Sequence, residues 1–458
     1  MHANMRRTLN LILIFFALIA FWLGYWGIAR RPELLARTDN PRRVVAEQQI
    51  QRGPIVDRHG APLVWSERND DGILERRYAG DWLAHAVGYY SLRHGVGGAE
   101  AAFDDELRGV AGRTAWQAWR DDLLHLPQVG EQVQLALDAD LQRAASEALG
   151  KASGAVVLLD TQNGQVLALV SRPTFDTNTL DEDWDSLREA AGNPLFNRAT
   201  QGLYPPGATF NLVVMAAALE ERLTTADEVF TDRVGRQQFG EATVRCANHP
   251  GLIDLSLLQA AAYGCNVAFA ELSLRLGGER LARYADWFGI GLAPGIEIPA
   301  QAGQLKGDEP WSDELLALTG MGQGGVLVSP LQMALIAATI ANDGAMPWPG
   351  LRSGSTVPPR PVIQPQTAQL VRQAMVLAVT HGPAHLAALP EVTVAGKVGT
   401  AEAGEEVAPH GWFVGFAPAG AGDGPRYAVA VIVEHGGSGG QSAAPIAAEM
   451  LERALSGQ

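Results

Sequence analysis

Lysine and cysteine are both scarce in this sequence of 458 residues. Lysine occurs only at Lys151, Lys306 and Lys397, although lysine and arginine together number 35. The two cysteines, Cys246 and Cys265, are too few for a disulfide scaffold or a cysteine-based zinc site. They could form one disulfide if the chain is exported, or remain two buried thiols, and both alternatives stay open.

The chain also lacks an excess of positive charge. Its formal net charge is −15 at pH 7, so a phosphate-binding surface would have to be a local exception, and we expect no nucleic-acid partner. His381 and His385 are four residues apart, but Gly382-Pro383 lies between them and no third ligand accompanies them. We therefore expect no metal site, and no motif indicates a cofactor.

A long uncharged stretch lies near the N-terminus. Residues 9–28 carry no charge over twenty positions, and arginines flank them on both sides. As a helix they would span about 30 Å, the thickness of a bilayer core. Trp22, Tyr25 and Trp26 gather at one end, as aromatics do at a membrane interface. We expect an uncleaved transmembrane anchor. The alternative is a cleaved signal peptide, whose apolar core would be shorter and for which residues 27–29 make a poor cleavage site.

The composition of the remaining chain is that of a globular protein, with 47% hydrophobic and 19% charged residues. Its length indicates two or three domains. We expect a cytoplasmic tail at 1–8, the membrane helix at 9–28, a polar linker at 29–50, a small domain at 51–132 and a packed α/β domain at 133–458.

Local patterns predict several elements of the large domain. Asn163-Gly164 suits a tight turn, so the apolar runs 155–159 and 166–170 predict a β-hairpin. Ser329-Pro330 predicts the start of a helix that runs through 342. Further expected elements are a helix at 208–221, strands at 392–395, 412–416 and 427–433, and a helix at 443–455. Strands at both ends predict one sheet whose edges come from opposite ends of the domain.

Five segments stand in an order typical of one protein family. They are Arg-Gly-Pro-Ile-Val-Asp-Arg-His-Gly at 52–60, Asn-Arg-Ala-Thr-Gln-Gly-Leu-Tyr-Pro-Pro-Gly at 197–207, Gly-Met-Gly-Gln-Gly at 320–324, Gly-Trp-Phe-Val-Gly-Phe-Ala-Pro at 411–418 and Gly-Gly-Ser-Gly-Gly at 436–440. Over about residues 52–455 the chain resembles the monofunctional, class B penicillin-binding proteins. Class A relatives insert a glycosyltransferase domain, and the roughly one hundred residues between Arg31 and Val133 are too few for one.

The resemblance implies an α/β (α+β) fold. The expected parts are a penicillin-binding, transpeptidase-like domain with an antiparallel sheet flanked by helices, a small pedestal or dimerisation-like domain before it, and one N-terminal transmembrane helix. It also implies a single-pass protein of the plasma membrane whose bulk is extracytoplasmic. The family transfers acyl groups in peptidoglycan synthesis through three motifs.

The first of these motifs, Ser-x-x-Lys, is degenerate here. Its serine attacks the substrate carbonyl, and its lysine, on the same helix face, takes the proton. The matching positions carry Ala208 and Asn211. Alanine has no nucleophilic atom, and an amide is not a usable base near neutral pH. The resemblance therefore implies a transpeptidase site that has lost both groups.

The other two motifs are partly kept. The Ser-x-Asn motif has lost the serine hydroxyl that relays the proton. The Lys-Thr/Ser-Gly motif has lost the hydroxyl that would bind the substrate carboxylate. The matching positions are Gly264 and Asn266 in the second motif, and Lys397, Val398, Gly399 and Thr400 in the third. Thr209 should point about 100° away from Ala208 around the helix, and Cys265 is the middle residue whose side chain normally faces away, so neither is expected to replace the serine. In triad enzymes, loss of the nucleophile alone costs on the order of a million-fold in rate.

Main-chain features of the cleft do not depend on these side chains. In the family the oxyanion hole uses backbone N–H groups, which here belong to Ala208 and Thr400. A peptide could still pair with strand 397–400 and meet Asn266, Lys397 and Thr400 as ligand-binding residues. The alternative is that these three side chains bind no ligand and only form hydrogen bonds with one another.

We therefore expect a pseudo-transpeptidase that acts as a scaffold or activator. By resemblance, its partner is a polytopic glycan-polymerising membrane protein, contacted by the transmembrane helix and by Asp57 and Arg58 of the pedestal. Those two residues could instead only pair with each other to hold the pedestal together. Two other functions stay open: a non-covalent sensor of stem peptides or β-lactams, and an active D,D-transpeptidase with a non-standard nucleophile.

Overall fold

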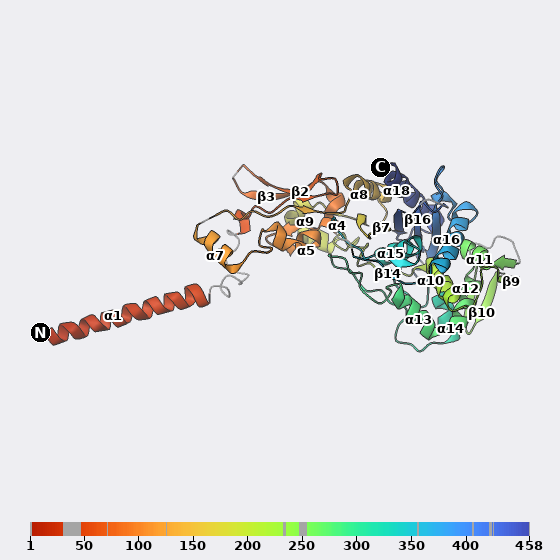
Figure 1. Cartoon of the computed structure of the whole chain (residues 1–458), viewed down its shortest axis with the longest axis horizontal. Coiled ribbons are helices and arrows are strands. Elements are labelled where there is room, and N and C mark those ends of the chain that lie inside the picture. The colour runs from red at the N-terminus through yellow and green to blue at the C-terminus, as the bar shows by residue number, and fades with distance from the viewer. Residues whose placement is uncertain are drawn as a thin grey trace.

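The computed structural model describes residues 2–30, 47–70, 72–124, 126–231, 235–246, 254–354, 357–404, 407–420, 424 and 426–457. Most of the linker expected at 29–50 lies outside these ranges. Helix α1 (His2–Gly24) continues into the π-helical turn η1 (Tyr25–Ala29) (Figure 1). The stretch Met5–Gly27 is long and apolar enough to cross a membrane, with a mean hydropathy of 2.1 and none of it buried against the rest of the protein.

The pedestal is built on a four-stranded sheet in the order β3-β2-β1-β6. Its strands are β1 (Ile55–Val56), β2 (Pro62–Arg68), β3 (Leu74–Tyr78) and β6 (Val133–Gln134). Around it lie η2 (Asp81–Leu83), α4 (Ala84–Val87), β4 (Tyr90–Ser91), β5 (Gly95–Val96), α5 (Gly98–Ala102), α6 (Asp104–Leu107) and α7 (Ala115–Leu123). Because β6 pairs in parallel with β1, the pedestal sheet extends just past the boundary expected at residue 132.

A buried ion cluster fixes the start of the pedestal. Glu100 is fully buried and accepts hydrogen bonds from Arg52, at 2.8 Å, and from Arg76, at 2.6 Å. Burial alone would lower the pKa of Arg52, but the carboxylates of Glu100 and Asp104 outweigh it and raise that pKa. Removing one partner would leave an uncompensated buried charge, so this cluster holds the Arg52 segment firmly against α5.

A five-stranded antiparallel sheet forms the centre of the large domain, in the order β15-β16-β17-β7-β8. Its strands are β7 (Gly154–Asp160), β8 (Val166–Arg172), β15 (Ala395–Ala401), β16 (His410–Ala417) and β17 (Tyr427–Val433). Strands β7 and β8 form the predicted hairpin, and Gly164 in its turn has φ +74°. As expected, the two edges come from opposite ends of the domain, and β15 is one of them.

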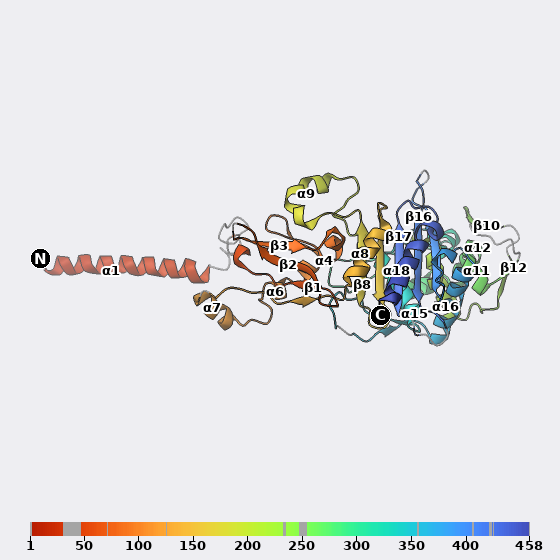
Figure 2. The same cartoon turned by 90° about the horizontal axis from the view of Figure 1, so that it is seen from above.

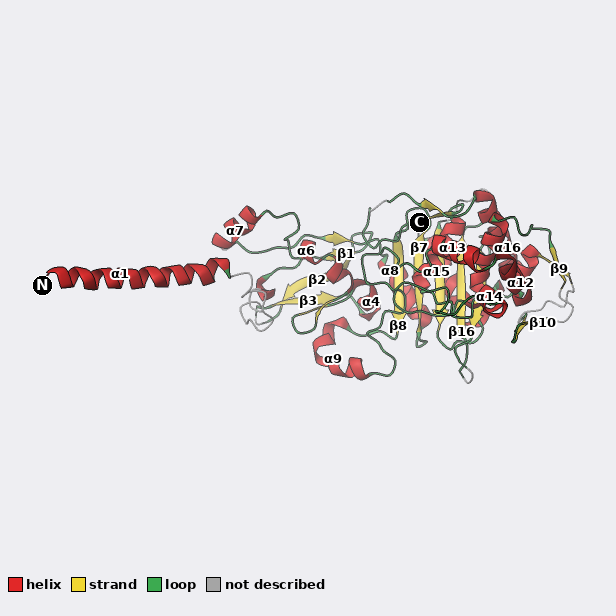
Figure 3. Cartoon of the chain, turned by 90° about the horizontal axis from the view of Figure 1, so that it is seen from below, coloured by secondary structure: helices red, strands yellow, loops and turns green. Residues whose placement is uncertain are grey.

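Helices cover both faces of this sheet (Figure 3). Along β17, Ala428, Ala430 and Ile432 face one hydrophobic core, while Val429 and Val431 face the other, as strand alternation requires. One face packs on α15 (Pro330–Ala341), which begins at the predicted Ser329 cap with a capping box. The other face packs on α8 (Ala139–Leu149) and α18 (Ala444–Ser456).

The remaining elements lie between β8 and β15 in the sequence. They are η3 (Thr177–Thr179), α9 (Leu180–Glu189), η4 (Gly207–Phe210), α10 (Asn211–Glu220), β9 (Val229–Thr231), β10 (Arg236–Phe239), β11 (Ala242–Arg245), β12 (Asp254–Ser256), α11 (Leu257–Tyr263), α12 (Asn266–Leu276), α13 (Gly278–Trp287), α14 (Asp313–Gly320), β13 (Ala345–Met346), β14 (Arg360–Pro361), α16 (Pro365–Thr380) and η5 (His385–Ala387); α17 (Gly439–Ser442) precedes α18. Helix α9 lies beside the pedestal strands (Figure 2). Just before it, Asn178 accepts a hydrogen bond from the Tyr78 N–H and donates one to the Tyr78 carbonyl oxygen.

Two expected elements differ from the structure. The helix expected from residue 208 begins as the 3-10 turn η4, because Gly207 has φ +54° and its N–H bonds to the Gly322 carbonyl; the α-helix starts at Asn211. The strand expected at 392–395 was placed too early, since β15 starts at Ala395. Its partner strand β16 ends before Pro418, which has no N–H for a continued ladder.

Candidate functional site

The first and third motifs meet through direct backbone packing. A Cβ atom on Gly399 would lie 2.6 Å from the Pro206 carbonyl oxygen, and one on Gly207 would lie 2.9 Å from the Thr400 carbonyl oxygen. Both distances are too short for a side chain, so each glycine is required where η4 approaches the edge strand β15. The turn that carries Ala208 is thereby held against the strand that carries Lys397.

The second motif closes the same site from the turn between α11 and α12. Gly264 ends α11 in the left-handed conformation, with φ +71°. A Cβ atom built on Gly264 would lie 3.0 Å from Lys397 Nζ and 3.6 Å from Ala208 Cβ. All three motif positions therefore converge, as the resemblance implied, although the nucleophile position holds only a methyl group.

Lys397 is buried at the centre of this convergence. Its side chain is 2% exposed, and Nζ donates a hydrogen bond of 3.1 Å to the Val398 carbonyl oxygen. Within the described ranges no carboxylate forms an ion pair with it. Burial lowers the pKa of Lys397 from its ordinary value to about 7.

Asn211 occupies the position of the motif lysine and is fully buried. Neither its Oδ1 nor its Nδ2 has a hydrogen-bond partner among the described residues. A buried amide without partners costs about 1–3 kcal/mol. The sequence predicted the loss of the base here but gave no sign of this uncompensated amide.

The other vestigial residues point in different directions. Asn266 Nδ2 donates a 2.8 Å hydrogen bond to the Arg245 carbonyl oxygen on β11. Val398 is 5% exposed and packs in the hydrophobic core on the side of the sheet that α18 covers. Thr400 is exposed. In the described part of the chain, Asn266, Lys397 and Thr400 are not hydrogen-bonded to one another. Their ligand-binding role remains a prediction.

Neither substitute nucleophile is presented to the cleft. Thr209 is fully buried, and its Oγ1 donates a 2.7 Å hydrogen bond to the Pro206 carbonyl oxygen. Cys265 is 3% exposed at the start of α12, and it is not joined to Cys246 by a disulfide. The disulfide alternative is therefore not the arrangement in this structure.

The predicted partner residues Asp57 and Arg58 differ in accessibility. Asp57 is 3% exposed, and its carboxylate accepts hydrogen bonds from the backbone N–H groups of His59, Ala61 and Ala139. It therefore stabilises the turn after β1 and ties it to α8. Arg58 is partly exposed and makes no ion pair with Asp57 within the described residues. Their partner role stays a prediction, with Arg58 as the accessible member.

Comparison with known protein families gives two matches. The penicillin binding protein transpeptidase domain matches residues 154–452, and the penicillin binding protein A dimerisation domain matches residues 52–133.

Relatives named PbpA match over nearly the whole chain. A peptidoglycan D,D-transpeptidase PbpA from Mycolicibacterium smegmatis is 33% identical over 99% of this chain and 99% of its own. The protein of the same name from Mycobacterium tuberculosis is 32% identical over 100% of both.

Solved structures agree with this overall arrangement. The ceftriaxone acyl-enzyme complex of penicillin-binding protein A from M. tuberculosis matches with a TM-score of 0.81 and 31% identity, covering 90% of this chain and 100% of that one. A D,D-transpeptidase domain from Eggerthella lenta gives a TM-score of 0.78 and 31% identity, covering 90% and 99% of the two chains.

Proposed function

The chain belongs to the penicillin-binding protein transpeptidase family, and we propose that it is a catalytically inactive member that serves peptidoglycan synthesis as a scaffold or activator. Relatives are named D,D-transpeptidases, and one solved relative is an acyl-enzyme. In this chain a methyl group stands at the position from which acylation would start, while the motif backbones keep their mutual approach. That alanine at 208 is the observation that carries the proposal.

The scaffold would act at the membrane. The apolar helix α1 anchors it as a single-pass protein of the plasma membrane, and the pedestal and large domain lie on the extracytoplasmic side. Its partner is a polytopic glycan-polymerising membrane protein, which contacts α1 and the pedestal around Asp57 and Arg58. The accessible Arg58 and the rigid turn at Asp57 support this assignment.

Complementation of a deletion strain tests the scaffold role. A chain with Arg58→Ala, or with residues 9–28 exchanged for an unrelated transmembrane helix, should fail to restore the normal cell wall in the deletion strain. Chains with Lys397→Ala or Asn266→Ala should restore the cell wall nearly as well as the unchanged chain. Arg188→Ala, at an exposed arginine, serves as a matched control for Arg58→Ala. Each variant must first be found folded and in the membrane fraction.

A second candidate function is a non-covalent sensor of stem peptides or β-lactams in the cleft. It is favoured by the edge strand β15, along which a peptide can pair, and by the exposed Thr400 at its end. If the cleft variants failed to complement while the helix exchange succeeded, the sensor would replace the scaffold.

A further inference from the structure

Helix α7 carries an apolar face that the described part of the chain leaves uncovered. Trp116, Trp119 and Leu123 recur at the spacing that places side chains on one face of a helix. The two indole rings stack with their centres 4.9 Å apart, and all three side chains are more than half exposed. Leu124 and Leu126, which follow the helix, are exposed as well. We call these five side chains the α7 face.

The charged side chains next to this face pair with one another. Asp121 accepts hydrogen bonds from Arg113, at 2.5 Å, and from Arg120, at 2.7 Å. Asp121 lies about 140° around the helix from Trp116, so this ion cluster is on a different side of α7. The α7 face itself consists only of aromatic and aliphatic surface. Whatever covers it must therefore bind by apolar contact.

The loop that carries α7 begins and ends beside the segment where the chain enters the pedestal. Glu47 is the first described residue after the linker, and its carboxylate pairs with Arg108, just before the loop. After the loop, the Gln128 carbonyl oxygen accepts a 3.0 Å hydrogen bond from the Gln51 N–H. Both ends of the loop are therefore fixed next to the segment that connects the pedestal to α1.

The same loop lies beside the C-terminal end of α1. Figures 1 and 2 view the protein from perpendicular directions, and both place α7 next to this end. Trp22, Tyr25 and Trp26 are found there, and such aromatics prefer a membrane interface. Residues 31–46 separate α1 and its final turn from the pedestal, and they can span at most about 55 Å. The α7 face is therefore within reach of the bilayer surface.

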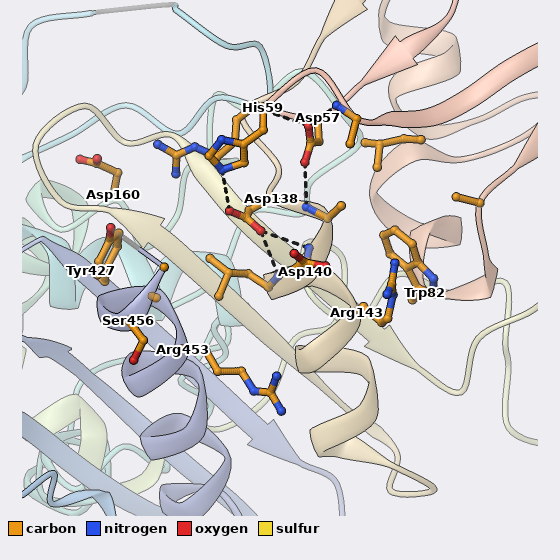
Figure 4. Close-up of a pocket in the computed structure, with 18 of the residues that line it drawn as sticks. Asp57, His59, Trp82, Asp138, Asp140, Arg143, Asp160, Tyr427, Arg453 and Ser456 are labelled. Atoms are coloured by element: carbon orange, nitrogen blue, oxygen red, sulfur yellow. Dashed lines mark hydrogen bonds and ion pairs between the residues drawn. The ribbon is translucent and has the colours of Figure 1, made fainter.

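The opposite end of the pedestal is joined to the large domain. There Asp57 accepts a 3.3 Å hydrogen bond from the Ala139 N–H, and His59 Nε2 lies 3.1 Å from Asp138 Oδ2 (Figure 4). The large domain thus holds one end of the pedestal, and the other end, with the α7 face, lies near α1. Asp57 and Arg58, the residues proposed to contact the membrane partner, are not part of the α7 face.

A lipid surface fits the α7 face better than a second copy of the chain does. A helix of nine residues is about 14 Å long, whereas a stable protein interface buries roughly 800 Å² on each partner. Tryptophan and leucine on one side of a short helix suit shallow burial at the boundary between lipid headgroups and acyl chains. Because α1 already holds the chain at the membrane, a small apolar face adds to that anchor without high affinity of its own.

We propose that the α7 face lies in the extracytoplasmic interface of the membrane that α1 spans, with Trp116 and Trp119 at the level of the lipid headgroups. This second contact limits how far the pedestal can tilt relative to α1. The proposal rests on the single-pass anchor of the proposed function, but it does not depend on the scaffold role.

Tryptophan quenching of the full-length chain in lipid nanodiscs tests the proposal. The lipid is phosphatidylcholine, with or without bromine on the acyl chain near the headgroup, and bromine quenches tryptophans that reach the lipid. Trp22, Trp26, Trp116 and Trp119 should be quenched, so Trp116→Phe with Trp119→Phe should lower the quenched part of the emission by about half. Trp287→Phe, at an exposed tryptophan of α13 in the large domain, is the matched control and should leave the quenched part unchanged.

Co-elution of the chain with the nanodiscs reports separately on α1. A chain that does not co-elute would show that both the anchor and this proposal are wrong. A chain that co-elutes, but in which Trp116→Phe with Trp119→Phe removes no more quenched emission than Trp287→Phe does, would overturn this proposal alone. Protection of the same two tryptophans from an aqueous quencher would then show that protein covers the α7 face.

Discussion

Gly264 and Lys397 share a space that a serine could not occupy without movement. A Cβ atom on Gly264 would lie 3.0 Å from Lys397 Nζ, and the glycine backbone has φ +71°, where side chains are disfavoured. A serine at position 264 would therefore need both a disfavoured backbone conformation and a shift of the lysine amine. The lysine amine is buried beside a glycine and an alanine, at the point where two hydroxyl groups are expected in an active member.

The close approach of position 264 to Lys397 predicts how many substitutions are needed to restore acylation. Ala208→Ser with Asn211→Lys restores the first motif but should not give measurable acylation by penicillin, because positions 264 and 398 still lack their hydroxyls. Adding Gly264→Ser and Val398→Thr should be necessary, at a stability cost of about 1–2 kcal/mol for the left-handed serine. Intact-mass kinetics check this. Family-like acylation by the double variant would mean that the second and third motifs are less impaired than the structure indicates.

Burial of Lys397 predicts a pH-dependent stability penalty. Since its folded pKa is about 7, against 10.5 in the unfolded chain, the unfolded state binds more protons between these values. The free energy of unfolding should therefore rise with pH through this window. Lys397→Met should stabilise the protein by on the order of 3 kcal/mol at pH 7 and by much less at pH 10.

Denaturant unfolding at the two pH values measures this difference. Lys151→Met, at an exposed lysine, is the matched control and should change stability little at either pH. An equal gain from Lys397→Met at pH 7 and pH 10 would show that the buried amine carries no such penalty.

The uncompensated amide of Asn211 predicts a stabilising substitution. Asn211→Leu has nearly the same shape and removes two buried polar atoms that lack partners, so it should raise the free energy of unfolding by about 1–3 kcal/mol. Asn342→Leu is the control, since Asn342 Nδ2 donates to the Ala345 carbonyl oxygen and its loss should destabilise. Destabilisation by both substitutions would indicate that Asn211 is hydrogen-bonded in solution.

The sequence was informative where local patterns determine structure. Asn163-Gly164 predicted the β7–β8 hairpin, and Ser329-Pro330 predicted α15. The resemblance to the penicillin-binding proteins implied that residues 208, 264 and 397 belong to one site, and the structure brings them together. The internal role of Asp57 was not predictable, because its partner at Ala139 is 82 residues away.

Without a serine at position 208, this family member should be unable to form an acyl-enzyme. Intact-mass spectrometry of the purified chain after prolonged incubation with excess penicillin tests it most directly, with an active D,D-transpeptidase run in parallel. The mass of this chain should stay unchanged, because Ala208 offers no nucleophile and Thr209 and Cys265 are buried. A stoichiometric penicilloyl adduct, located by peptide mapping to any residue of the cleft, would contradict it.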